Sequence, residues 1–303
     1  INVSEMVKFA SDVLNQRKLI TLNAQEKLTY SQLVQVGSSA GGARAKALIA
    51  WNEKTNEIRS GQLILDEDYD YWLMKFDNVA KNGDHGLEDV PEYTLIEYAY
   101  YKMALDAGIL MSDCRIYSNA GENHFMTKRF DRTQGKKVHM QSLGAMAHIS
   151  YKEPGLCSYE MAAGYMREIH LPIKDIEQFY SRMVFNCVAV NQDDHVKNIS
   201  FLMNRSGEWR LSPAYDVTYS YDVTNKWLSA HQMTINGKKS NINLTDLLSA
   251  GENMGLKKKK CKDIISRISL VVSDFEKYAE EVNIREKTFC DIKKILDQNK
   301  VEV

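Results

Sequence analysis

The stretch Asn191-Gln192-Asp193-Asp194-His195-Val196-Lys197-Asn198 decides how this sequence is interpreted. It places two carboxylates, an imidazole, a lysine and three carboxamides within eight residues. Eighteen residues after Asn198, the segment Ser212-Pro213-Ala214-Tyr215-Asp216 brings a further aspartate after a short apolar strand. Carboxylate and amide oxygens suit Mg²⁺, which keeps water and substrate phosphates as its remaining ligands. The two stretches therefore predict a Mg²⁺ site that includes Asn198 and Asp216.

The spacing within the first stretch is typical of phosphoryl transfer. In kinases an aspartate accepts the proton of the substrate hydroxyl, and an asparagine five positions later binds magnesium. Asp193 and Asn198 have this separation, so Asp193 is the candidate base, with the adjacent Asp194 as the alternative. Each segment alone would equally suit a helix cap or a turn, and the chain offers His195 no H-x-x-x-H partner for a zinc site. The order of the segments along the chain is what favours a kinase.

Two upstream segments complete that order. Lys75 lies in the apolar segment Leu73–Phe76, where a lysine is costly unless it is paired, and nucleotide phosphates would pair it. The segment Gly37–Lys46 is rich in glycine and fits two alternatives. It matches G-x-S-x-G, the nucleophile elbow of serine hydrolases, with Ser39 as nucleophile, and it also fits a loop that cradles phosphate. A strand is predicted directly after this loop, which favours the phosphate loop, and the sequence contains no G-x-x-x-x-G-K-[ST] motif.

Composition excludes several classes of protein. The chain has 303 residues, of which 44% are apolar and 26% charged, as in globular proteins with a substantial core. Its 39 basic and 40 acidic residues give a net charge of -1, so no direct binding to nucleic acid is expected. The five scattered cysteines indicate neither a disulfide framework nor a zinc ribbon. The sequence contains no membrane span or signal peptide, which predicts a cytoplasmic protein without a membrane partner.

The pattern of elements predicts an α+β fold with two lobes. Residues 1–132 form a small mixed lobe, with one helix over 92–107 among its strands. Its strands are expected at 47–51, 71–76, 114–118 and 124–130. Residues 133–303 form a larger, mainly helical lobe interrupted by a hairpin over 199–211. Its helices are expected at 139–148, 157–169, 173–191, 243–254, 258–281 and 285–299.

Five segments together resemble a known family, the HipA-like serine/threonine kinases of bacterial toxin–antitoxin systems. They are Ser39–Lys46, Met74–Phe76, Arg129–Arg132, Gln192–Asn198 and Pro213–Asp216, and Gln141–Gly144 adds to them. The resemblance runs from about residue 36 to 240 and implies a two-lobed kinase-like fold. Asp194 departs from the family at a position that is often glycine. The chain also lacks most of the family's N-terminal subdomain, which implies a small, HipT-like member or a truncated chain.

The resemblance implies a role for each matching position. Lys75 would bind the α- and β-phosphates of ATP, Asp193 would be the base, and Asn198 and Asp216 would hold Mg²⁺. Lys128-Arg129-Phe130-Asp131 looks like the hinge that meets adenine and ribose. Ser39, Ala40, Gly41 and Gly42 would form the nucleotide loop, and His195 and Lys197 would line the phosphate region. Family members phosphorylate themselves in the glycine loop, where Ser39 matches, with Ser38 beside it.

The implied function is an ATP- and Mg²⁺-dependent protein Ser/Thr kinase. By the resemblance its substrate would be a translation component such as an aminoacyl-tRNA synthetase, and an antitoxin would be a partner. Two alternatives from other classes remain at this stage. One is a serine hydrolase that uses Ser39, and the other is a catalytically silent kinase-like binding module.

Overall fold

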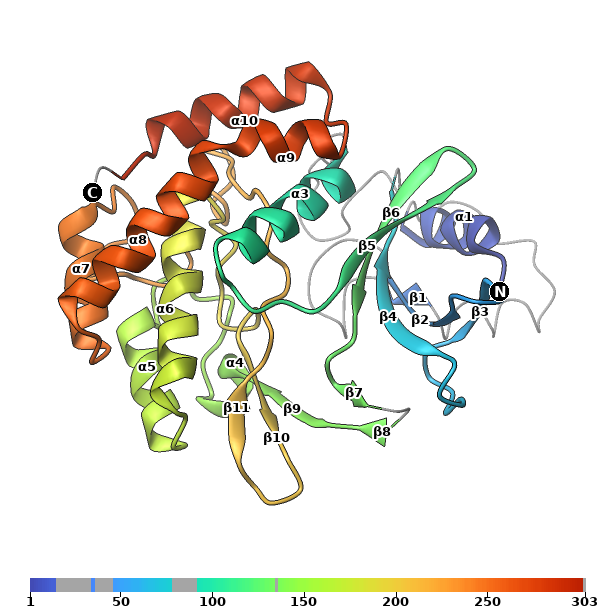
Figure 1. Cartoon of the computed structure of the whole chain (residues 1–303), viewed down its shortest axis with the longest axis horizontal. Coiled ribbons are helices and arrows are strands. Elements are labelled where there is room, and N and C mark those ends of the chain that lie inside the picture. Colours follow the sequence, from blue (N-terminus) through green and yellow to red (C-terminus); the bar gives the residue numbers. More distant parts are fainter. Residues whose placement is uncertain (15–33, 36–45, 78–91, 134–135, 302–303) are drawn as a thin grey trace. The chain divides into compact units, whose positions relative to one another are not determined.

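The computed structural model describes residues 1–14, 34–35, 46–77, 92–133 and 136–301. Contacts divide the chain into two compact units. The first comprises Ile1–Tyr98 and Ser112–Lys137, and the second comprises Ala99–Met111 and Val138–Val303. The first mixes strands with helix and the second is mainly helical (Figure 1), so the predicted α+β class is confirmed.

The first unit is built on an antiparallel sheet of order β1-β2-β4-β6-β5, with β3 paired to β2. Its described strands are β1 Val34–Gln35, β2 Lys46–Asn52, β3 Glu57–Ser60, β4 Asp70–Lys75, β5 Cys114–Asn119 and β6 Glu122–Lys128. Helix α1 (Val3–Leu14) and the first turns of α3 (Tyr93–Asp106) belong to the same unit, and a short hairpin of β7 (Arg132–Thr133) and β8 (Lys136–Lys137) follows β6. The predicted strands are confirmed, whereas α1 and β3 lacked a clear signal.

The side chains of β4 alternate between an apolar face that packs against α1 and a face that carries Lys75. Trp72, Met74 and Phe76 are buried in one cluster with Val3 and Met6 of α1, so α1 covers this face of the sheet. Successive side chains of a strand point to opposite faces. Lys75 therefore lies on the other face, and its register partner across the β2–β4 pair is Lys46.

The second unit is centred on α6 (Ile173–Val188), of which eleven of sixteen residues are buried. The unit also contains α4 (Leu143–Met146), α5 (Tyr159–Glu168), α7 (Leu244–Asn253), α8 (Lys258–Ser273), α9 (Phe275–Glu281) and α10 (Glu286–Gln298). A three-stranded antiparallel sheet of order β11-β10-β9 accompanies them, with β9 at His139–Ser142, β10 at Ser200–Met203 and β11 at Trp209–Leu211. The predicted hairpin over 199–211 is confirmed.

Two predicted helices are wrong in part. Residues 139–142 are not helical but form β9, because Phe201 and its neighbours in β10 pair with them, and only the four residues of α4 follow. The predicted helix over 258–281 breaks at Asp274, which separates α8 from α9. The break lets Phe275 become fully buried between Tyr100 and Phe289, with ring centroids 6.1 and 5.9 Å away. In both segments, contacts with residues distant in sequence determine the secondary structure.

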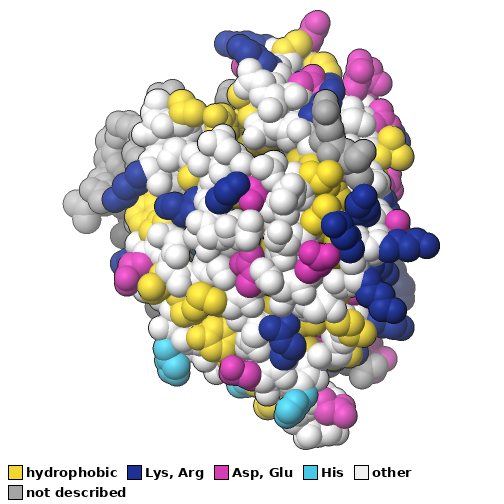
Figure 2. Space-filling view, turned by 90° about the vertical axis from the view of Figure 1, so that its left-hand side faces the viewer, with side chains coloured by type: hydrophobic (Ala, Val, Ile, Leu, Met, Phe, Trp, Pro, Cys, Tyr) yellow, Lys and Arg dark blue, Asp and Glu magenta, His cyan; other side chains and the backbone are white. Residues whose placement is uncertain are grey.

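Charged side chains of both signs share the surface. On the face drawn in Figure 2, Lys and Arg side chains gather along the right-hand edge, and acidic side chains are scattered across the view. The run Lys257–Lys260 is exposed at the start of α8, where Lys260 pairs with Glu177 at 3.0 Å. No described helix is both long and apolar enough to cross a membrane.

Candidate active site

The segment Asn191–Asn198, here called the catalytic loop, follows the C-terminal end of α6. Its start is held by the backbone, since Asn191 N–H donates to Asn186 O at 2.9 Å and Gln192 N–H donates to Ser220 O at 2.9 Å. Val190 just before it has φ +55°, a left-handed conformation that is unusual for a β-branched residue. Such conformations persist where the surroundings enforce them, often at functional sites.

Asp193 and Asn198 lie together within the loop. Asn198 Nδ2 donates to the Asp193 carbonyl at 2.8 Å, which fixes the carboxamide and leaves its Oδ1 as the atom suited to a cation. The Asp193 side chain is 46% exposed, and its Oδ1 lies 3.8 Å from His195 Nε2. The predicted base is thus a carboxylate that a substrate can reach.

Asp194 has the opposite environment. Its side chain is 0% exposed and accepts hydrogen bonds from Tyr159 Oη at 2.8 Å, His231 Nδ1 at 2.9 Å and the Gln232 N–H at 2.7 Å. Burial by itself would lower the pKa of His231, but the negative charge of Asp194 outweighs burial and holds that pKa well above its ordinary value. A carboxylate enclosed by three donors is poorly placed to receive a substrate proton.

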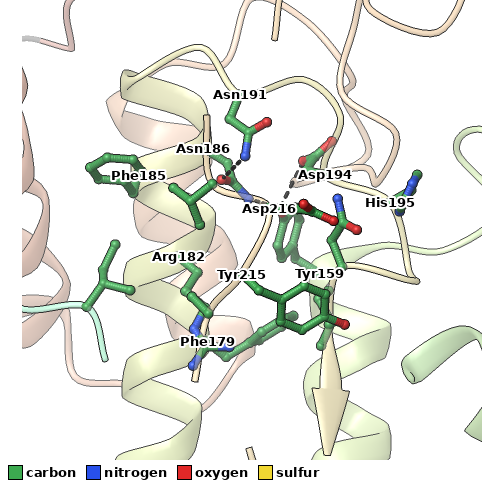
Figure 3. Close-up of a pocket in the computed structure, with 15 residues that line it drawn as sticks. Tyr159, Phe179, Arg182, Phe185, Asn186, Asn191, Asp194, His195, Tyr215 and Asp216 are labelled. Carbon is green, nitrogen blue, oxygen red and sulfur yellow. Dashed lines mark hydrogen bonds between the residues drawn. The ribbon is translucent and has the colours of Figure 1, made fainter. Parts of the chain in front are cut away.

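Asp216 lines the same pocket as Asn198 and His195 (Figure 3). Its φ of +52° is left-handed, and the residue before it, Tyr215, is anchored by a 2.6 Å hydrogen bond from its Oη to Lys197 O. The buried Arg182 donates to Ser212 O at 2.5 Å and so fixes the start of the segment. Two segments far apart in sequence therefore place the carboxylate of Asp216 and the amide of Asn198 in one pocket.

These two groups fit a magnesium ion. The described residues contain no cluster of three or more His, Cys, Asp or Glu side chains that could hold a metal by themselves. Mg²⁺ does not need such a cluster, because it binds proteins through one or two carboxylates and completes its shell with water and phosphate oxygens. One carboxylate and one amide oxygen are the donor set that nucleotide-bound Mg²⁺ uses in kinases.

An aromatic side chain orders the middle of the catalytic loop. Lys197 Nζ lies 3.5 Å from the centroid of the Tyr151 ring, and the imidazole of His195 packs edge-on against the same ring at 5.7 Å. Cation–π contact of this kind holds an ammonium group in place without neutralising its charge. Tyr151 therefore holds both Lys197 and His195, and His195 is the one of the two with a contact to Asp193, at 3.8 Å.

In the first unit, Lys75 pairs with a residue that was not predicted from sequence. Its Nζ lies 2.6 Å from Glu97 Oε1 of α3, and the two side chains are 8% and 3% exposed. This lysine therefore has a partner within the protein, in addition to the nucleotide phosphates expected from the sequence. A lysine of the sheet paired with a helix glutamate is also a feature of protein kinases, so the helix over 92–107 was the signal that could have indicated Glu97.

The predicted hinge, Lys128–Asp131, is fixed at both ends. Lys128 N–H donates to Asp113 O and Arg129 N–H to Tyr71 O, each at 2.8 Å. Asp131 accepts two hydrogen bonds from Arg129, at 2.9 and 2.7 Å, and one from Arg132 at 2.8 Å. Burial would raise the pKa of Asp131, but the hydrogen bonds and charge of Arg129 outweigh burial and lower it. The remaining predicted site residues, Ser38, Ser39, Ala40, Gly41 and Gly42, lie outside the described residues.

Comparison with known proteins assigns the family. A profile of the HipA-like C-terminal domain matches residues 38–275. The chain belongs to this HipA-like family. A Haemophilus influenzae protein named "Putative kinase" is 25% identical over 291 residues, which covers 84% of this chain and 78% of that protein.

Two solved structures share the fold of this HipA-like chain. The first is HipA of the Shewanella oneidensis MR-1 toxin–antitoxin system, solved with HipB and operator DNA. It has a TM-score of 0.67 at 16% identity, over 99% of this chain and 69% of that chain. The second is the Helicobacter pylori proinflammatory kinase CtkA, with a TM-score of 0.50 at 14% identity, over 78% of this chain and 90% of that chain. At 14–16% identity, these structures show a shared fold and nothing more specific.

Proposed function

We propose that this HipA-like protein is an ATP- and Mg²⁺-dependent protein Ser/Thr kinase. The observation that carries the proposal is the arrangement of the second unit, where Asn198 and Asp216 line one pocket and the accessible Asp193 precedes Asn198 by five residues. This is the combination of base and metal-binding groups that phosphoryl transfer requires.

Each residue has a defined task in this proposal. Asp193 accepts the proton of the substrate hydroxyl as that oxygen bonds to the γ-phosphorus, while the bond from this phosphorus to the β-phosphate oxygen breaks and ADP leaves. Asn198 and Asp216 would hold Mg²⁺, which would neutralise charge on the transferring phosphoryl group. Lys75, positioned by Glu97, contacts the α- and β-phosphates. His195 and Lys197 line the phosphate region, where the ammonium group of Lys197 contributes positive charge.

Residues 1–132 and residues 133–303 have different roles in this function. The first stretch contacts the nucleotide, through Lys75, through the hinge residues Lys128, Phe130 and Asp131, and through the glycine loop Ser39–Gly42. The second carries the base and the metal ligands. Autophosphorylation at Ser39, or at Ser38 beside it, would add about two negative charges to a loop that approaches ATP, and would therefore weaken ATP binding.

The physiological substrate and partner belong to the same proposal. HipA of Shewanella oneidensis was solved with HipB and operator DNA, which supports an antitoxin as a partner of this chain. A translation component such as an aminoacyl-tRNA synthetase is the proposed substrate. Expression of the protein followed by phosphoproteomics would identify which serine or threonine is modified.

The direct test is phosphate transfer from labelled ATP, with and without Mg²⁺. The wild type should label itself or an added protein only with Mg²⁺, and Asp193→Asn and Asp216→Ala should reduce transfer by about 10²–10⁴-fold. Asp263→Asn, an exposed carboxylate on α8, is the matched control and should retain full activity. ATP binding without transfer would indicate a silent binding module. ATP-independent ester hydrolysis that Ser39→Ala abolishes would indicate a hydrolase.

A further inference from the structure

We infer that Asp194 is a positioning residue, and that a chain of hydrogen bonds ending on it fixes the catalytic loop so that only Asp193 can act as the base. This hydrogen-bond network, here called the Asp194 hub, comprises Asn191, Asn186, Tyr159, Asp194 and His231. The inference rests on the proposed function and deepens it, because it concerns how the same site is held.

The hub runs without interruption through two helices and the loop (Figure 3). Asn191 Nδ2 donates to Asn186 Oδ1 of α6 at 3.0 Å, and Asn186 Nδ2 donates to Tyr159 Oη of α5 at 3.0 Å. Tyr159 Oη in turn donates to Asp194 Oδ2 at 2.8 Å. Each polar group uses its donor toward the next residue, so the direction of the chain is fixed from Asn191 to Asp194.

Asp194 is the acceptor on which all branches converge. Beyond Tyr159, its carboxylate accepts from His231 Nδ1 and from the Gln232 N–H, so three donors meet two oxygens. An ionised carboxylate has four lone-pair sites and no donor of its own, which suits this arrangement. An asparagine would turn an NH₂ group toward one set of these donors and leave buried groups unsatisfied.

The hub grips the catalytic loop on both sides of the reacting residue. Asn191 is the first donor of the hub and Asp194 is its final acceptor. Asp193 lies between them in sequence, and its own side chain is half exposed. The left-handed Val190 immediately before the loop shows that this backbone conformation is enforced. Asn191 anchors the loop two residues before Asp193, and Asp194 anchors it directly after. A shift of about 1 Å in a reacting group can lower the rate about 10²-fold, so anchors this close to Asp193 affect the rate of transfer.

The simpler explanation is that the hub only stabilises the second unit, as buried polar networks can. The two explanations differ in what a small perturbation does. If the hub only stabilises the fold, perturbing it would lower the stability of the unit and leave the activity of the folded protein unchanged. If the hub positions the catalytic loop, the same perturbation would lower the rate of phosphate transfer in the folded protein and loosen the loop.

The test uses the full chain with Tyr159→Phe, which removes one hydroxyl from the hub and keeps the ring. Tyr180→Phe is the matched control, because Tyr180 is also fully buried and its Oη donates to Leu247 O at 2.9 Å, outside the hub. Three quantities are measured on each folded variant: kcat for phosphate transfer, the calorimetric Kd for ATP, and hydrogen exchange of a peptide spanning 190–196.

We expect Tyr159→Phe to lower kcat about tenfold or more, with the Kd for ATP within about twofold of wild type. Exchange of the 190–196 peptide should become faster, and Tyr180→Phe should change neither kcat nor this exchange. Asp194→Asn should have the larger effect, and adding Tyr159→Phe to it should cost less than the product of the two single effects, because both act through one link. If Asp194→Asn does not fold, the Tyr159→Phe comparison alone decides.

Two failures are distinguishable. A wild-type protein that transfers no phosphate overturns the proposed function itself. An active wild type with a Tyr159→Phe variant whose kcat and loop exchange equal those of Tyr180→Phe overturns the hub alone and leaves the kinase assignment standing.

Discussion

Lys75→Met should destabilise the protein far more than an ordinary lysine substitution. The Lys75–Glu97 pair is almost fully buried, with its charged atoms 2.6 Å apart. Removing one partner of such a pair leaves an uncompensated charge in the interior, which costs about 3–5 kcal/mol of the free energy of unfolding. The loss of transfer activity in a Lys75 variant would then combine two effects, a missing phosphate contact and a weakened fold.

The double variant Lys75→Met with Glu97→Leu separates these effects. Replacing a buried pair by apolar residues of similar volume is often neutral or stabilising by about 1–4 kcal/mol. The ring of Phe125, whose centroid lies 5.7 Å from Lys75 Nζ, offers the new methionine an apolar neighbour. We therefore expect the double variant to recover the stability of the wild type and to remain inactive.

Urea unfolding followed by tryptophan fluorescence measures this, since Trp72 lies in the same strand as Lys75. Lys54→Met is the control, because the Lys54–Asp68 pair has a similar distance of 2.9 Å but is exposed on both sides. Its unfolding midpoint should match that of the wild type. Two results would contradict a stabilising Lys75–Glu97 pair: Lys75→Met unfolding at the same urea concentration as Lys54→Met, or a double variant no more stable than Lys75→Met.

Three further predictions concern other parts of the molecule. Asp193→Asn should abolish most transfer while the melting temperature stays within about 2 °C, since the side chain is half exposed and asparagine has nearly the same size. A large drop in melting temperature would give Asp193 a structural role. Burial would raise the pKa of Asp246, but hydrogen bonds from Lys238 and Asn236 lower it. Because the pKa of Asp246 is lowered in the folded state, the ionised carboxylate stabilises the fold fully above about pH 4. This contribution to the free energy of unfolding is lost as the pH falls through the pKa of the folded protein. Asp246→Asn should therefore cost about 1–2 kcal/mol at pH 7, and the difference from wild type should shrink in acid; a constant difference would contradict this. Finally, a maleimide at pH 7 should label only Cys290 in the folded protein, because the other four cysteines are buried, and mass spectrometry showing two fast-reacting thiols would contradict the fold around one of them.

Local sequence pattern predicted the parts of the fold that depend on local signals. Alternation around Lys75, the turn at 204–207 and the helical spacing of 92–107 all correspond to observed elements. The same pattern failed at 139–142, because strand β9 exists only through pairing with β10, some sixty residues away. Helical periodicity cannot register a partner strand that distant.

The candidate site divides in the same way. The carboxylate and amide groups of the catalytic loop stand out because polar residues with fixed spacing interrupt an apolar region. Glu97 and His231 did not stand out, since each is defined by a contact with a residue more than twenty positions away. The sequence also left open which of two adjacent aspartates is the base, a question on which burial bears directly: one carboxylate is half exposed and the other is fully enclosed.

The alternation of β4 has a consequence for changes in chain length. Inserting or deleting one residue before Trp72 would exchange the two faces of the strand. Lys75 would then enter the apolar cluster with α1, and the tryptophan and methionine side chains would move to the face that now holds the Lys75–Glu97 pair. No single substitution could restore the original faces of all these side chains. The Asn204–Gly207 turn between β10 and β11 is exposed and joins two strands whose pairing ends before it, so extra residues there leave every register intact. A reporter tag or a cross-linkable peptide would therefore be tolerated at this turn, whereas β4 admits only replacements that keep its length.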